Sequence, residues 1–91
     1  MTSRELLEKR QALLQQQIAA NLDLLIGTLA KSPAMRGYNL TTKRQGKTIT
    51  AYVRKDLRRQ VQIMTGRYQH VRRLLRQLSQ INWQLLQQSA D

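Results

Sequence analysis

The chain of 91 residues lacks the residue types on which several classes of small protein depend. It has no cysteine and one histidine, so the sequence excludes a disulfide framework, a thiolate metal site and a histidine cluster. No apolar run approaches the roughly 20 residues that cross a bilayer, and the opening MTSRELLEKR has no apolar signal-peptide core. We therefore predict a soluble, cytoplasmic protein with no metal and no other cofactor.

Acidic residues are also scarce, with 5 Asp and Glu against 16 Lys and Arg and a formal net charge of +11. The excess is concentrated between residues 34 and 76, where Asp56 is the only acid. A run of like charge often marks a solvated helix face, but such a face normally contains acids that pair locally. The pattern favours a polyanionic partner, and nucleic-acid binding depends on arrays of Lys and Arg that displace counterions.

The same scarcity argues against catalysis. The five acids do not cluster with His70 or with a nucleophile, and general acid–base catalysis requires such groups within hydrogen-bond reach. The chain has no glycine-rich phosphate loop and no metal-ligand spacing. We predict that it is not an enzyme.

Leucines at helical spacing predict a first helix over residues 2–31. Thr2 and Glu5 have the spacing of a capping box at its start, and Pro33 is expected to end it. The predicted apolar stripe is Leu7, Leu14, Ile18, Leu22, Leu25 and Leu29.

Residues 38–53 alternate as two strands and predict a β-hairpin. With Gln45 and Gly46 at the centre of the turn, Tyr38 faces Val53 and the apolar side chains of both strands share one face. The other face is then polar, and the turn is flanked by basic residues. An isolated hairpin is only marginally stable in water, so its apolar face is expected to lie on a helix.

A second helix is predicted over residues 55–88, because apolar residues repeat along it in alternating steps of four and three. Its seam is expected to pack against another helix, within the chain or in a second copy. We predict a homo-oligomer, with a dimer favoured, and Asn82 as a polar residue that sets register. The seam comprises Leu57, Val61, Met64, Tyr68, Val71, Leu75, Leu78, Asn82 and Leu85.

These elements predict one mainly α domain over residues 1–91. Its fold is expected to be two long antiparallel helices, coiled-coil-like, with the β-hairpin inserted between them (α-ββ-α). The short chain buries proportionally little surface, which also favours self-association.

The candidate nucleic-acid-binding residues lie at the hairpin and at the start of the second helix. A two-stranded ribbon fits the major groove of B-DNA, and a helix N-terminus favours phosphate. Threonine and tyrosine hydroxyls on the polar face can donate to phosphate oxygens or base edges. The predicted site is Lys43, Arg44, Lys47, Thr48, Thr50, Tyr52, Arg54, Lys55, Arg58 and Arg59.

The segment GYNLTTKRQGKTITAYVRKDL, followed by a heptad helix ending in LSQINWQLL, resembles a small uncharacterised domain family of bacteria and archaea that is associated with transposases and mobile elements. Arg54 stands where that family often has proline, and its glycine- and cysteine-rich approach to the hairpin is missing. The resemblance implies a mobile-element context and DNA, with a transposase as a candidate partner. The matching residues are Gly37, Tyr38, Leu40, Lys43, Gly46, Lys47, Thr48, Tyr52, Val53, Lys55 and Leu57.

Two functions remain open on the sequence. The first is a DNA-binding accessory protein of a transposition, recombination or other mobile-element system, with RNA as a less favoured ligand. The second is a protein–protein interaction or oligomerisation module that uses the heptad helix and has no nucleic-acid role.

Overall fold

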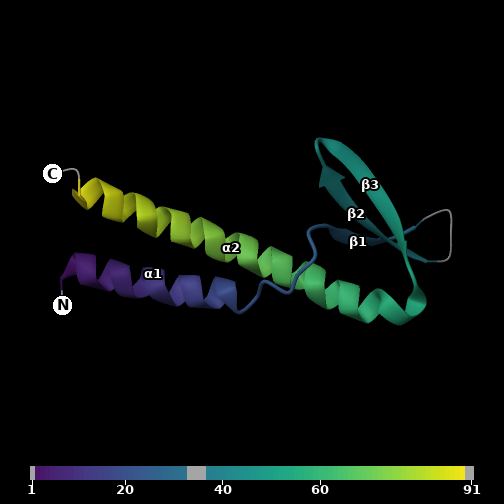
Figure 1. Cartoon of the computed structure of the whole chain (residues 1–91), viewed down its shortest axis with the longest axis horizontal. Coiled ribbons are helices and arrows are strands. Elements are labelled where there is room, and N and C mark those ends of the chain that lie inside the picture. Colours follow the sequence, from purple (N-terminus) through teal and green to yellow (C-terminus); the bar gives the residue numbers. More distant parts are fainter. Residues whose placement is uncertain (1, 33–36, 90–91) are drawn as a thin grey trace. The chain divides into compact units, whose positions relative to one another are not determined.

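The computed structural model describes residues 2–32 and 37–89, so Pro33 lies outside the described residues. The chain divides into two compact units. The helical unit comprises Met1–Leu22 and His70–Asp91, and the sheet unit comprises Asp23–Gln69. In order, the elements are α1 (Ser3–Ala19), β1 (Thr28–Lys31), β2 (Tyr38–Arg44), β3 (Lys47–Val53), a short 3₁₀ turn (Lys55–Leu57) and α2 (Arg58–Ser89), as drawn in Figure 1.

The predicted fold class is wrong, because a three-stranded antiparallel sheet and not a hairpin stands between the helices. The strand order is β1-β2-β3. The additional strand, β1, comes from the segment that was expected to complete the first helix. An isolated two-stranded hairpin is only marginally stable in water. A third strand adds backbone hydrogen bonds, which stabilise the sheet.

The first helix ends at Ala19 for a local reason. Its start is as predicted, since the Glu5 amide donates to Thr2 Oγ1 at 3.2 Å. At the other end, the side-chain amide of Asn21 donates to the Gln17 carbonyl at 2.7 Å. That carbonyl would accept the Asn21 backbone N–H if the helix continued, so the side chain replaces the next helical bond.

The register predicted for the β2–β3 hairpin is confirmed. Tyr38 pairs with Val53 and Arg44 pairs with Lys47, with the intervening residues in step. Both turn residues have positive φ, +52° at Gln45 and +79° at Gly46, as a two-residue hairpin turn requires. The alternation of side chains along the strands therefore sorts an apolar face from a polar one.

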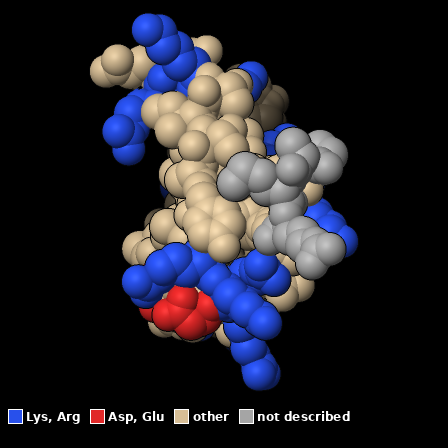
Figure 2. All heavy atoms as spheres, turned by 90° about the vertical axis from the view of Figure 1, so that its right-hand side faces the viewer, with Lys and Arg blue, Asp and Glu red and all other residues tan. Residues whose placement is uncertain are grey.

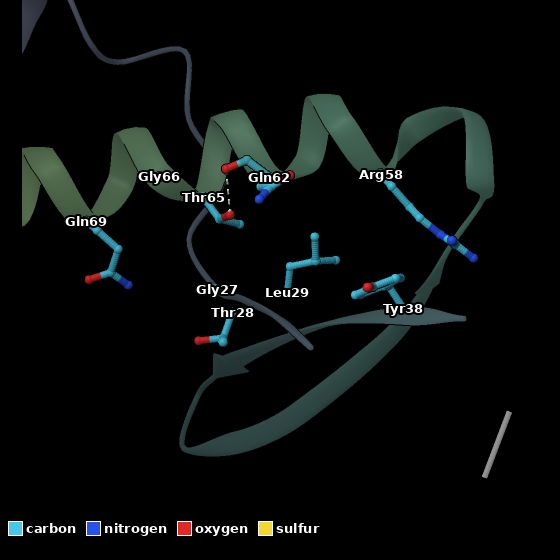
Figure 3. A pocket seen from close by; sticks show the side chains of 9 residues that line it. All are labelled: Gly27, Thr28, Leu29, Tyr38, Arg58, Gln62, Thr65, Gly66 and Gln69. Carbon is cyan, nitrogen blue, oxygen red and sulfur yellow. Dashed lines mark hydrogen bonds between the residues drawn. The ribbon is translucent and has the colours of Figure 1, made fainter. Parts of the chain in front are cut away.

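Strand β1 extends the apolar face of this sheet. Leu29 lies opposite Leu40, and Lys31 lies opposite Tyr38. Leu29 and Tyr38 point toward the first part of α2 in Figure 3. The pairing stops at Thr41, so the ribbon from Thr42 to Ile49 has only two strands.

The segment before β1 is tied to α2 within the sheet unit. The Leu25 amide donates to the Met64 carbonyl at 3.1 Å. Arg67 Nη1 donates to the Asp23 carbonyl at 2.9 Å and lies 3.3 Å from Asp23 Oδ2. These contacts hold the chain in an extended path where helical spacing was expected to continue.

The helical unit has its own small core. Figure 1 shows α1 antiparallel to the second half of α2. The buried residues of this core are Leu14, Leu74, Ile81 and Leu85, with Leu7, Ile18 and Leu78 packed against them. The contact stripe on α2 therefore includes Leu74 and Ile81, which the predicted seam omitted.

The first four residues of the predicted seam, Leu57 to Tyr68, belong to the sheet unit, and Leu57 is 42% exposed. Within the helical unit, two residues of the predicted seam lie outside this stripe. Leu75 is 48% exposed, and Asn82 is exposed and accepts a hydrogen bond from Gln11 Nε2 at 2.8 Å. The observed stripe has Leu74 and Ile81 where the predicted seam has Leu75 and Asn82, and it shares Leu78 and Leu85 with that seam. Both sets repeat in alternating steps of four and three, so periodicity alone does not distinguish the two sets.

No described helix, the 32-residue α2 included, has an apolar stretch long enough to span a bilayer.

Two glycines of the sheet unit are expected to respond oppositely to alanine. At Gly27 (φ +155°) an added Cβ would lie 2.7 Å from the Thr41 carbonyl oxygen, whereas at Gly66 it would meet nothing within 4 Å. We expect Gly27→Ala to destabilise the fold by about 1–3 kcal/mol and Gly66→Ala to stabilise α2 by up to about 1 kcal/mol. Urea denaturation of both variants checks this, and equal effects would contradict the close approach of Gly27 to the Thr41 carbonyl.

Candidate nucleic-acid interface

The tip of the β2–β3 ribbon carries three of the predicted cations. Lys43, Arg44 and Lys47 are all exposed. Arg44 and Lys47 are direct cross-strand partners, and Lys43 pairs with Thr48. Like charges placed opposite each other destabilise a sheet, so the ribbon tip carries a cost that an anionic ligand would relieve.

The polar face of the ribbon lies between this tip and the base of the sheet. Thr48, Thr50 and Tyr52 alternate along β3 and are exposed. Tyr52 is 57% exposed even though its ring packs on the backbone of Gly37, where an added Cβ would lie 2.8 Å from Tyr52 Cε2. The predicted hydroxyl donors therefore share one accessible surface.

The predicted cations at the start of α2 fall into two kinds. Arg54, Lys55 and Arg59 are exposed, and Arg54 pairs with Asp56 at 3.3 Å in a pair whose side chains are both 68% exposed. Such a solvated pair contributes little stability. Arg58 is different, because it is half-buried and its guanidinium carbon lies 4.8 Å from the centre of the Tyr38 ring.

Most of this positive charge has no partner among residues 2–32 and 37–89. There, no ion pair involves Lys43, Arg44, Lys47, Lys55 or Arg59. Figure 2 shows Lys and Arg gathered over the ribbon tip at the top and over the start of α2 at the bottom, with further Lys and Arg atoms along the right-hand edge and mostly uncharged surface in the middle. The acidic side chains in view lie within the lower group.

The sequence did not predict two hollows beside the Tyr38–Arg58 pair, because they depend on β1. The first, the amide hollow, has a volume of about 570 Å³. The second, the basic hollow, has a volume of about 560 Å³ and is lined by Lys31, Gly37, Tyr38, Lys55 and Arg58. The amide hollow is lined by Gly27, Thr28, Leu29, Tyr38, Arg58, Gln62, Thr65, Gly66 and Gln69.

The predicted site consists of Lys, Arg, Thr and Tyr side chains. In the part of the chain that the structure describes, no three His, Cys, Asp or Glu residues group as a metal site would require.

Comparison of the chain with protein-family models, with curated proteins and with solved structures finds no match. The function is therefore argued from the residues and their arrangement.

Proposed function

We propose that this protein binds duplex DNA without catalysing a reaction, and that it does so through the ribbon tip and the start of α2. In this proposal it acts in the cytoplasm, on the nucleoid, as an accessory to transposition, recombination or another mobile-element process. The mobile-element part of the proposal follows from the sequence resemblance alone. The DNA-binding part follows from charge and shape.

The uncompensated charge of the sheet unit is the observation that carries the proposal. Residues 23–69 include ten Lys and Arg and two acids, a formal excess of +8. Asp23 pairs with Arg67 and Asp56 pairs with Arg54, so both acids of the unit are already engaged. The remaining cations repel one another until a polyanion neutralises them.

The shape of the ribbon supports duplex DNA over duplex RNA. Because β1 stops pairing at Thr41, the tip from Thr42 to Ile49 is a two-stranded ribbon. The major groove of B-DNA is about 12 Å wide and admits such a ribbon, whereas the major groove of A-form RNA is too narrow for side chains to read.

Competition between the two duplexes tests this preference. A fluorescent DNA duplex of mixed sequence is bound to saturation, and unlabelled DNA or RNA of the same sequence is then added while anisotropy is measured. We expect the DNA competitor to displace the probe at a concentration about tenfold below that of the RNA competitor, because only DNA accepts the ribbon in its major groove. Equal or better competition by RNA would contradict groove insertion.

A second candidate function is protein–protein interaction through the helical unit. Several large apolar side chains of α1 and α2 are exposed there, among them Leu6, Leu13, Leu75, Trp83 and Leu86. Exposed apolar side chains at helical spacing favour helix packing against another helix, and a second copy of the chain would satisfy the predicted dimer. Sedimentation equilibrium measures this directly. A monomer at all concentrations would contradict self-association and leave a different protein as the partner.

A further inference from the structure

The Tyr38–Arg58 pair forms a common wall between the amide hollow and the basic hollow. Both residues line both spaces. Tyr38 belongs to β2 and Arg58 to the first turn of α2, so the wall joins the sheet to the helix within one unit (Figure 3). The two hollows are therefore adjacent, and they differ in chemistry.

The amide hollow combines an aromatic ring with neutral hydrogen-bonding groups, and Arg58 on the shared wall is the one charged side chain among its described lining residues. Gln62 and Gln69 each supply an amide donor and acceptor, and Leu29 and Tyr38 supply apolar surface. The hydroxyl of Thr65 is already engaged with the carbonyls of Val61 and Gln62 at 2.9 and 3.1 Å. The volume of about 570 Å³ lies in the usual range for small-ligand sites. These groups suit a flat, polar, uncharged ring.

The basic hollow suits an anion. Lys31, Lys55 and Arg58 line it, and no acid is among those of its lining residues that the structure describes. Arg58 Nε is buried and has no hydrogen-bond partner in the described structure. Nε is closed off from solvent, so the other two guanidinium nitrogens of Arg58 are the ones that can donate to a phosphate oxygen in the hollow.

We propose that the two hollows together bind one unstacked nucleotide of the DNA. Its base occupies the amide hollow against Tyr38, and its phosphate occupies the basic hollow beside Arg58. Stacking on an aromatic ring tolerates any base, and the glutamine amides can hydrogen-bond a Watson–Crick edge that is no longer paired. The inference depends on the proposed DNA binding and adds a preference for DNA that contains an unpaired nucleotide.

Such a preference follows from the cost of exposing a base. In an intact duplex the base must be unpaired and unstacked before it enters the hollow, and this cost is smallest for a nucleotide that is already unpaired. A duplex with a single-nucleotide bulge is therefore expected to bind more tightly than the same duplex without it. The sheet cations contact both duplexes alike.

Gly66 provides a substitution that fills the amide hollow without disturbing the fold. It lines the hollow, and an added Cβ would meet nothing within 4 Å. Methionine is also a better helix former than glycine, so Gly66→Met is expected to fold. Gly66→Ala is the matched control, because it makes the same backbone change with little added volume.

The experiment measures anisotropy for a perfect duplex and for the same duplex with one bulged nucleotide. We expect the wild-type protein and Gly66→Ala to bind the bulged duplex about tenfold more tightly, and Gly66→Met to bind both equally at the wild-type perfect-duplex affinity. Binding to both duplexes without a bulge preference, or a preference that survives in Gly66→Met, would overturn the inference and leave the proposed function intact. Absence of binding to either duplex would overturn both.

Discussion

Replacing Lys43, Arg44 and Lys47 together by alanine is expected to lower the affinity for duplex DNA on the order of 100-fold at about 0.1 M salt. Each cation that neutralises a phosphate releases a counterion and adds about 0.9 to the magnitude of the slope of log K against log salt. Without the three cations, the slope should therefore fall in magnitude by about 3. The measurement is anisotropy with a labelled duplex at several salt concentrations.

This variant should fold as the wild-type protein does. All three side chains are exposed and have no ion pair among residues 2–32 and 37–89, so their removal relieves repulsion at the tip. The matched control is alanine at Lys9, Arg10 and Arg76, which removes the same charge from exposed positions of the helical unit. An equal loss of affinity in both variants would show that net charge, and not the ribbon, governs binding.

Leu14→Ala is expected to destabilise the helical unit by about 2–5 kcal/mol. Leu14 is 8% exposed and is the buried residue of α1, where it packs in the core with Leu74, Ile81 and Leu85. The core has few members, so the cavity left by one leucine removes a large share of the packing that holds α1. Urea denaturation followed by circular dichroism gives the free energy of unfolding.

The adjacent residue provides the control for this prediction. Leu13 is 51% exposed, so Leu13→Ala removes the same atoms from a position outside the core and should change stability by less than about 1 kcal/mol. Comparable losses for the two variants would place both leucines in buried contacts, and would indicate that α1 packs on a partner through its second face.

The parts of the fold that follow from local rules were predictable. The start of α1 follows from Thr2, and the β2–β3 register follows from alternation and from a turn sequence that accepts positive φ. The second helix follows from sustained periodicity, although its first three residues, Lys55–Leu57, form a 3₁₀ turn that this periodicity does not predict. In each case the signal and the structure lie in the same short stretch of chain.

Strand β1 was not predictable from the same rules. Leu22, Leu25 and Leu29 have helical spacing, and a four-residue strand is too short for a clear alternation. What makes Thr28–Lys31 a strand is pairing with β2, a partner that follows it in the chain. Asn21 and Gly27 were the available local signals, since the first ends the helix and the second permits the turn into the strand.

The candidate site also has one part that local sequence rules predicted and another part that they did not predict. The basic ribbon and the cations at the start of α2 were found from charge and alternation. The half-buried position of Arg58 and the two hollows required the sheet to be placed against α2, because Gly27, Thr28 and Leu29 line one of them. Tertiary contact, and not composition, makes Arg58 differ from Arg59.

The dependence of duplex binding on salt tests the central claim most directly. At least five cations, Lys43, Arg44, Lys47, Lys55 and Arg59, have no ion pair among residues 2–32 and 37–89. If each neutralises one phosphate, a plot of log K against log salt for a mixed-sequence duplex should have a slope of about −4 to −5. Weak binding that does not change with salt would contradict the account.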